Sequence, residues 1–310
     1  MTRIAIAALG WLLGASSLSA DQPVPKWNEV DSWIYQLTGY PQGKLDRIAK
    51  ADSDLVVVDL SRDGGADYFT RSEISAVQQS GKIVLAYFEI GAIEKYRPEW
   101  KDVPEDLMAG PVDGWPKEQY VRYWDERWWP VVKGRVDQAI RAGFDGAYLD
   151  MITTYEEIPG TGIALEERAN RMVSLIARIS RHAKMQAPDF KIVPQNCPEL
   201  YSWSPWSGIP NKTYLRSIDG IGIESVFFLA HDKPATAPWC REVRDNALTI
   251  RRRGKLVLGV DYARKASNIS ESYRRQRKLG FVPYVSVVAL DRIFSEPQSA
   301  ERSPSEDGSR

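Results

Sequence analysis

Five apolar runs that each end in a carboxylate constrain the fold of this 310-residue chain more than any other feature. The runs cover residues 55–59, 83–89, 144–150, 221–224 and 256–261. Continuous apolar runs of this length are typical of parallel strands with both faces buried. Segments with helical hydrophobic spacing separate them, and repeated strand-then-helix units predict an α/β fold with a parallel sheet. The five acids would then gather at the edge where parallel strands end.

Three further runs complete a set of eight predicted strands, at residues 33–37, 191–194 and 281–288. Eight such units predict a closed (β/α)8 TIM barrel, which typically takes about 250 residues. An open doubly wound sheet is the alternative, but it leaves the eighth strand surplus, and no Gly-rich fingerprint follows the first strand. We therefore expect one barrel domain over residues 21–294, with its eighth helix short or missing.

A long insert, residues 91–125, follows the third strand and is rich in aromatic side chains. Long irregular segments inside a compact domain are usually functional or disordered, and the density of aromatics here disfavours disorder. Residues 198–217 are rich in Pro, Trp and Ser, so no regular helix is expected there. The predicted helices cover residues 45–51, 70–81, 127–142, 164–185, 236–253 and 270–279.

The two ends of the chain are expected to lie outside the fold. Residues 1–20 combine Arg3, a short apolar stretch and small residues before Ala20, the pattern of a secretory signal peptide. We predict cleavage after Ala20 and a secreted or periplasmic protein; an uncleaved anchor is disfavoured because the apolar stretch is too short to span a bilayer. No other stretch is apolar enough to cross a membrane. Residues 295–310 are polar and predicted to be disordered.

Charge and composition exclude several functions. Lys and Arg together number 41, as do Asp and Glu, so no basic excess points to nucleic acid. With only two histidines and no cysteine motif, neither a metal site nor a cofactor is expected, and a monomer is predicted. Cys197 and Cys240 could pair in an oxidising compartment or remain separate buried thiols. The 11 Trp and 14 Tyr either fill the core or form surfaces that stack on sugar rings.

The strand-end acids carry the predicted chemistry, since catalytic groups of such barrels sit at the C-terminal ends of the strands. Carboxylates that converge on one pocket repel, so that some are protonated and others ionised. That difference is what acid/base cleavage of a glycosidic bond requires. Asp150 and Glu224 are the predicted catalytic pair, because each ends a short strand introduced by Asp-Gly and neither has a basic residue nearby in the sequence.

The remaining polar and aromatic residues near the strand ends are predicted to bind substrate. For Asp59 and Asp261 the alternative of capping loops or pairing with Arg62 and Arg264 stays open, and Glu89 is expected to bind substrate or give electrostatic support. Tyrosines on the strands face either the site or the helices, and Trp124 or Trp115 could stack on sugar. The predicted substrate-binding set is Gln36, Asp59, Tyr87, Glu89, Trp124, Tyr148, Asn196, Asp261 and Tyr262.

Several of these segments together are similar to one known family. They are WIYQL at 33–37, YFEIG at 87–91, FDGAYLD at 144–150, PQN at 194–196, DGIGIE at 219–224 and VDYA at 260–263. With these segments in this order, the chain resembles the barrels of glycoside hydrolase family 114, also called the endo-α-1,4-polygalactosaminidase family. The resemblance implies a secreted, endo-acting enzyme that cleaves α-1,4-linked galactosamine-containing exopolysaccharide. It further implies a retaining mechanism with Asp150 as nucleophile and Glu224 as acid/base.

Two other functions remain open from the sequence. One is a non-catalytic carbohydrate-binding barrel of an exopolysaccharide system. The other is a barrel glycosidase that acts on a neutral α-glycan.

Overall fold

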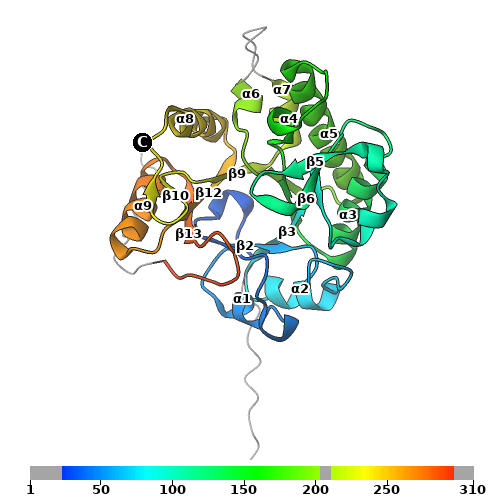
Figure 1. The fold of residues 1–310 in the computed structure, drawn as a ribbon. Coiled ribbons are helices and arrows are strands. Elements are labelled where there is room, and N and C mark those ends of the chain that lie inside the picture. Colours follow the sequence, from blue (N-terminus) through cyan, green and yellow to red (C-terminus); the bar gives the residue numbers. More distant parts are fainter. Residues whose placement is uncertain (1–22, 203–210, 297–310) are drawn as a thin grey trace, which may run out of the picture.

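The structure is a computed structural model that describes residues 23–202 and 211–296. The predicted signal peptide lies outside these residues, as does nearly all of the predicted disordered tail. Eight parallel strands form the centre of the molecule, and helices surround them (Figure 1). The eight are β1 (Trp33–Tyr35), β2 (Leu55–Asp59), β3 (Ile83–Glu89), β7 (Gly146–Asp150), β8 (Lys191–Pro194), β9 (Gly220–Glu224), β12 (Leu256–Tyr262) and β13 (Val282–Ser286).

The strands pair in two groups that meet at both seams. The orders are β1-β2-β3-β7-β8 and β9-β12-β13. At one seam a parallel bridge joins Gln195 to Gly222. At the other, the Trp33 indole donates to the Val282 carbonyl at 3.0 Å, and the Leu37 amide donates to the Leu290 carbonyl at 2.8 Å. The predicted (β/α)8 barrel is therefore confirmed, and its strand ends lie within a few residues of the predicted ones.

The helices follow the strands as the alternation predicts. They are α1 (Asp46–Lys50), α2 (Arg71–Gln78), α3 (Trp129–Ala142), α5 (Leu165–Gln186), α8 (Pro238–Arg252) and α9 (Ala266–Lys278), with the shorter α4 (Thr154–Glu157), α6 (Glu199–Ser202) and α7 (Lys212–Ser217). Local sequence fixes several ends: Thr70 and Glu73 form the capping box of α2, and Gly143 ends α3 with φ of 85°. Within the described residues up to 296, no helix follows β13.

Helix α9 starts four residues earlier than predicted, and a distant carboxylate explains the difference. The Asp232 carboxylate accepts the amides of Arg264 and Lys265 and the side-chain amide of Asn268, all at 2.9 to 3.0 Å. These bonds anchor the first turn from a segment more than thirty residues away in the sequence. The absence of a helix from residues 198–217 was also wrongly predicted, because α6 and α7 both lie there.

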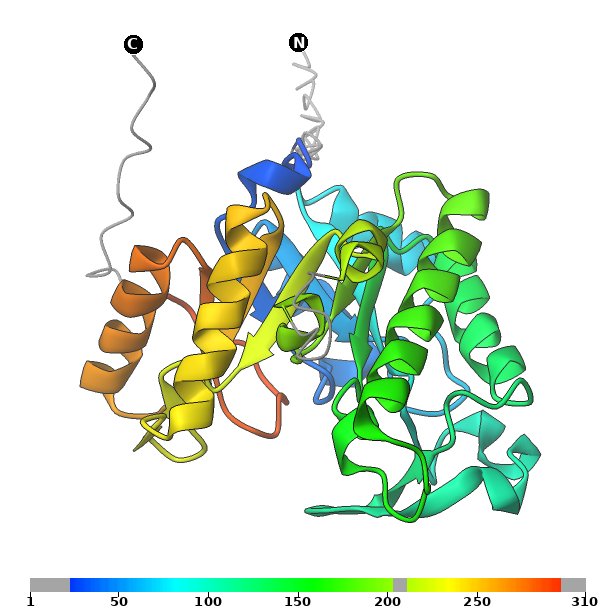
Figure 2. The same cartoon turned by 90° about the horizontal axis from the view of Figure 1, so that it is seen from above.

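The predicted irregular insert is a small antiparallel sheet, and that expectation was wrong. Its strands are β4 (Ala92–Glu94), β5 (Met108–Val112) and β6 (Trp115–Val121), in the order β4-β6-β5, with short 3-10 turns at Pro98–Asp102 and Glu105–Leu107. Glycines and prolines in β5 and the following turn suggested a loop, but the β5–β6 register shifts around Pro111 absorb them. Figure 2 shows this sheet on the side toward which the barrel strands point.

Aromatic rings fill the interior of the barrel. The Tyr35 ring lies 5.2 Å from that of Tyr148, and the Trp33 ring lies 5.7 Å from both Tyr35 and Tyr284. A side chain at position 222 would overlap the Tyr148 hydroxyl, so glycine is required there. Many of the abundant aromatics therefore fill the core, and the layer of rings forms the floor under the strand ends.

Candidate active site

Asp150 and Glu224 lie at the ends of β7 and β9, with β8 between them. The Tyr87 hydroxyl donates to one Asp150 carboxylate oxygen at 2.7 Å, and the Met151 amide donates to the other at 2.6 Å. Each oxygen of Asp150 therefore has one donor, and neither donor carries a charge.

Glu224 is held in a similar way by two other side chains. The Tyr262 hydroxyl donates to Oε1, and the Asn196 side-chain amide donates to Oε2 at 3.1 Å. The Asn196 carbonyl oxygen in turn accepts the Glu224 backbone amide at 3.0 Å. Asn196 thus fixes both the backbone and the side chain of Glu224.

The two carboxylates face the same floor of tyrosines. Burial raises the pKa of Tyr35 and of Tyr148, and the negative charges of Asp150 and Glu224 raise both further. The structure therefore brings together five of the predicted residues, Asp150, Glu224, Tyr87, Asn196 and Tyr262, over the ring of a sixth, Tyr148. Whether these groups touch substrate stays a prediction.

Asp150 has a strongly perturbed acidity. Burial is the main cause, and the charge of Glu224 adds to it; the hydrogen bonds from Tyr87 and Met151 act in the opposite direction. The balance raises the pKa of Asp150 from 3.8 to about 7. A carboxyl group whose pKa lies near neutral pH is typical of catalytic sites, because small changes in its surroundings then move its proton.

The backbone is strained where the site strands end. Met151, Asn196, Cys197 and Ser225 all have left-handed φ angles, between 54° and 64°, directly after β7, β8 and β9. A residue with a side chain loses roughly 1–2 kcal/mol in this conformation. Such strain concentrates at functional sites, where the surrounding structure holds it. No pattern in the sequence predicted it, since none of the four is glycine.

Beside Asp150 lies a buried group of acids from the insert and from the ends of β2 and β3. Arg97 donates to both oxygens of Asp59, at 2.7 and 2.8 Å, and to both oxygens of Glu94, at 2.7 and 3.0 Å. Asp59 thus forms an ion pair with Arg97, and its contact with substrate stays a prediction. The sequence left open a pair of Asp59 with Arg62, but Arg62 pairs with Glu73 instead.

Glu89 and Glu118 complete this buried group. Glu89 is 2% exposed and lies opposite Asp150 in the β3–β7 register. Burial and the charges of Glu94 and Glu118 raise its pKa, while burial and neighbouring charges raise the pKa of Glu118 to about 8. Burial and mutual repulsion therefore favour the protonated form of both groups beside Asp150, and whether Glu89 contacts substrate or gives electrostatic support stays a prediction. Glu118 was missed in the sequence because it lies in the insert, for which no strand was predicted.

Two predicted binding residues hold loops instead. Asp261 is fully buried, and its carboxylate accepts the Phe227 and Phe228 amides, the Ser272 hydroxyl and the Gln276 amide, at 2.6 to 3.1 Å. Gln36 is 3% exposed and donates to the carbonyls of Thr38 and Asp291. In this structure both side chains therefore hold loops, and a contact of either with substrate stays a prediction.

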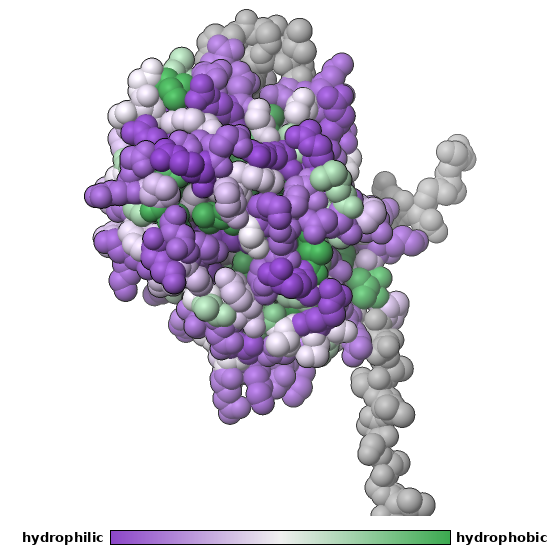
Figure 3. All heavy atoms as spheres, turned by 90° about the vertical axis from the view of Figure 1, so that its right-hand side faces the viewer, coloured by the Kyte–Doolittle hydropathy of each residue, from purple (hydrophilic) through white to green (hydrophobic). Residues whose placement is uncertain are grey.

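Trp124 lines a hollow whose described lining residues include neither Asp150 nor Glu224. Its ring packs edge-on against Tyr123 at 4.9 Å, and the Arg171 guanidinium lies 5.7 Å above it. With Trp129 and Arg178 it lines a separate hollow of about 320 Å³ between α3 and α5. The face that contains these helices is mostly hydrophilic (Figure 3). A stacking role for Trp124 at the reacting sugar is therefore not supported.

The structure also bears on the predictions about the two cysteines, a metal site and membrane-spanning helices. Both Cys197 and Cys240 are buried free thiols, so of the two alternatives the structure has separate thiols. Among residues 23–202 and 211–296 no set of three or more His, Cys, Asp or Glu side chains is arranged to hold a metal ion. Within the same residues no helix has the length and apolar content needed to cross a bilayer.

Two carboxylates at the C-terminal ends of the strands of a (β/α)8 barrel fit the class of glycoside hydrolases, which use such a pair. The comparison with known sequences specifies which one. The sequence pattern of glycoside-hydrolase family GH114 matches residues 15–301, and the chain belongs to that family.

Similar proteins agree with this placement. An uncharacterized protein of Deinococcus radiodurans is 32% identical over 275 residues, 87% of this chain and 84% of that protein. The crystal structure of Aspergillus fumigatus Ega3 in complex with galactosamine aligns with a TM-score of 0.67 at 16% identity, over 86% of this chain and 95% of Ega3. The glycoside hydrolase domain of Pseudomonas aeruginosa PelA aligns with a TM-score of 0.66 at 16% identity, over 86% and 98% of the two chains. At this identity the structural likeness shows a shared fold.

Proposed function

We propose that the protein is an exported, endo-acting glycosidase that cleaves α-1,4-linked galactosamine-containing polysaccharide. The observation that carries the proposal is the pair of Asp150 and Glu224, each held by two uncharged donors over one aromatic floor. The family supports hydrolysis of a glycosidic bond, and the complex of Ega3 with galactosamine supports an amino sugar. Acidic side chains around the pair would suit a protonated amine.

In the proposed mechanism Asp150 is the nucleophile and Glu224 is the acid/base. One Asp150 oxygen attacks the anomeric carbon, while the Glu224 carboxyl gives its proton to the leaving glycosidic oxygen. The bond from the anomeric carbon to that oxygen breaks, and a sugar ester of Asp150 remains. Ionised Glu224 then takes a proton from water, whose oxygen attacks the same carbon and releases Asp150. Tyr87 and Asn196 would keep the two carboxyl groups oriented in both steps.

The acidity of Asp150 makes the protonation state decisive. A nucleophile must be ionised, yet below about pH 7 Asp150 holds a proton in the free enzyme. We therefore expect kcat/KM to fall as the pH drops through 7, since kcat/KM reports the free enzyme. If Asp150 were instead the general acid, kcat/KM would fall as the pH rises through the same value. Whether kcat/KM falls toward acidic or toward alkaline pH therefore shows whether Asp150 is the nucleophile or the general acid.

The test compares wild type with Asp150→Asn and Glu224→Gln on three substrates: an α-1,4-galactosamine polymer, its N-acetylated form and neutral α-glycans. We expect cleavage of the first by wild type and loss of at least about a thousandfold in both variants. Binding without cleavage would support the carbohydrate-binding barrel. Cleavage of neutral glycans alone would support the second alternative, and equal rates in all three proteins would place the active site elsewhere.

Export is part of the same proposal and has its own test. The first twenty residues have the pattern of a signal peptide, so the mature chain should begin at Asp21. N-terminal sequencing of the protein recovered from the periplasm or the culture medium would check this. An intact Met1 on exported protein would contradict the predicted cleavage.

A further inference from the structure

A hollow of about 470 Å³ adjoins Glu224. It lies between the ends of β8 and β9 and helices α4, α6 and α8. Its described lining residues are Thr153, Glu156, Glu157, Asn196, Cys197, Glu199, Glu224, Ser225, Trp239, Glu242 and Val243. Its size is in the range of small-molecule sites, about 300–1,000 Å³. It therefore has room for a sugar next to the proposed acid/base.

We propose that this hollow is the subsite for the leaving part of the chain, and that it selects a sugar with a protonated amine through Trp239 and Glu242. The inference rests on the proposed function. A general acid protonates the leaving oxygen, so the sugar attached to that oxygen must lie beside the acid. Glu224 and its partner Asn196 both line the hollow, whereas Asp150 is not among its described lining residues.

Trp239 supplies a flat surface at the mouth of the hollow. It lies in the first turn of α8 and is 53% exposed, so its ring is accessible to a ligand in the hollow. The described residues show no hydrogen bond from its indole, so nothing in that part of the chain fixes the ring by a polar contact. An exposed indole can pack against the apolar face of a sugar and attract a nearby cation.

Glu242 supplies the charge. It is three residues after Trp239 on α8, so the two side chains share a face of the helix. It is exposed, and within the described residues no hydrogen bond or ion pair engages its carboxylate. Neither Lys nor Arg is among the described lining residues, so a ligand ammonium would meet no competing cation.

The other acids of the hollow are already held in place. The Tyr155 hydroxyl lies 2.7 Å from a Glu156 oxygen and 2.9 Å from a Glu199 oxygen, and the Tyr120 hydroxyl donates to Glu157 at 2.9 Å. Burial raises the pKa of Glu199, so the negative field of the hollow comes mainly from Glu156 and Glu157, while Glu242 has no partner among the described residues and can contact a ligand. The field favours a cationic sugar over its neutral N-acetylated form.

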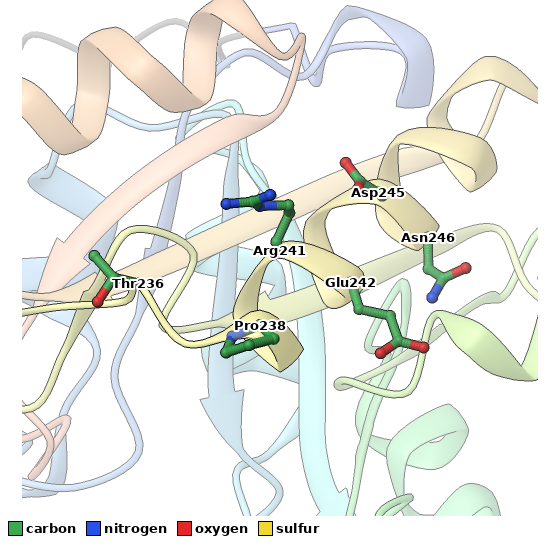
Figure 4. A pocket seen from close by; sticks show the side chains of 6 residues that line it. All are labelled: Thr236, Pro238, Arg241, Glu242, Asp245 and Asn246. Carbon is green, nitrogen blue, oxygen red and sulfur yellow. The ribbon is translucent and has the colours of Figure 1, made fainter.

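The hollow continues along α8. Glu242 also lines a second trough of about 450 Å³, together with Thr236, Pro238, Arg241, Asp245 and Asn246. Figure 4 shows Glu242 and Asn246 projecting from the same side of the helix. A chain that leaves past Glu224 could thus extend beyond one sugar. This arrangement suits cleavage within a polymer rather than at its end.

The experiment uses galactosamine hexamers labelled at the reducing end, with free or N-acetylated amines. Calorimetric titration of Asp150→Asn, which retains all described lining residues, measures binding without turnover. Adding Trp239→Ala should weaken binding of the free-amine hexamer roughly tenfold. Adding Glu242→Gln should weaken it about three- to fivefold and reduce the preference over the N-acetylated hexamer. Asp189→Asn, which removes an exposed carboxylate before β8 at the opposite end of the barrel, is the matched control.

Cleavage products show which side of the bond is affected. With an active Asp150, Trp239→Ala should shift cleavage toward the labelled end, because fewer sugars are then held beyond Glu224. Unchanged binding and an unchanged product pattern in both variants would overturn the inference while hydrolysis by wild type upholds the function. If binding depends on Trp239 and Glu242 but wild type hydrolyses nothing, the inference about the hollow stands and the proposed hydrolysis is refuted. No binding by Asp150→Asn would overturn both.

Discussion

Replacement of Tyr87 by phenylalanine tests the central electrostatic argument. The Tyr87 hydroxyl donates to Asp150 at 2.7 Å, and this bond lowers the carboxyl pKa against the effects of burial and Glu224. The ring is 7% exposed and packs 6.3 Å from Tyr35, so Tyr87→Phe removes only the donor and keeps the packing. We expect the acid limb of kcat/KM to move to higher pH.

The size of the shift follows from the strength of the bond. A hydrogen bond to a charged group contributes about 1.5–3 kcal/mol, and about 1.4 kcal/mol corresponds to one pKa unit. The pKa of Asp150 should therefore rise from about 7 to roughly 8–9. At pH 7 the ionised fraction then falls from one half to between roughly a tenth and a hundredth, which lowers kcat/KM about five- to fiftyfold.

The assay is the ratio of kcat/KM for variant and wild type on one galactosamine oligomer between pH 5 and 9. The ratio cancels the titration of the substrate amine, which is the same for both enzymes. We expect a low ratio at acidic pH that recovers toward one as Asp150 ionises. Tyr35→Phe is the matched control, because Tyr35 donates to Gln195 and to neither carboxylate. A ratio below one that does not vary with pH would refute the assignment of the limb to Asp150.

Three further changes probe stability, each by denaturant unfolding with activity measured beside it. Arg97→Met should lower the free energy of unfolding by about 3–5 kcal/mol, because Asp59 and Glu94 would remain buried without their cation; a loss below 1 kcal/mol would contradict this. Asp261→Ala should cost about 3 kcal/mol yet leave KM of the remaining folded enzyme near wild type, whereas a substrate contact would raise KM. Asp150→Asn should raise the free energy of unfolding by about 1–3 kcal/mol at pH 8. The reason is that a raised carboxyl pKa destabilises the folded wild type increasingly as the pH rises from 4 to 7. If the difference in free energy of unfolding between variant and wild type were the same at pH 4 and pH 8, the prediction would be contradicted.

Much of the fold was predictable because its signals are local. Apolar runs marked all eight strands, and Thr70 and Gly143 marked helix ends through caps that involve only neighbouring residues. The sheet in the insert could not be predicted from local signals, because β4 pairs with β6 across more than twenty residues and register shifts accommodate its prolines. The start of α9 was missed for the same reason, because Asp232 anchors it from a distance.

The strand-end rule located the site but could not assign a role to each acid. Asp59 and Asp150 both end buried strands, and in the sequence only indirect signals, such as the nearby Arg62, set Asp59 apart from Asp150. The structure does so through their partners: a guanidinium occupies both oxygens of Asp59, while a phenol and a backbone amide hold Asp150. In an ion pair, the charge of a carboxylate is neutralised by a cation of the protein. Uncharged donors instead orient the carboxylate and leave its negative charge available to a ligand. The partners of these two acids, and not their positions alone, therefore separate the ion-paired Asp59 from Asp150, the proposed nucleophile.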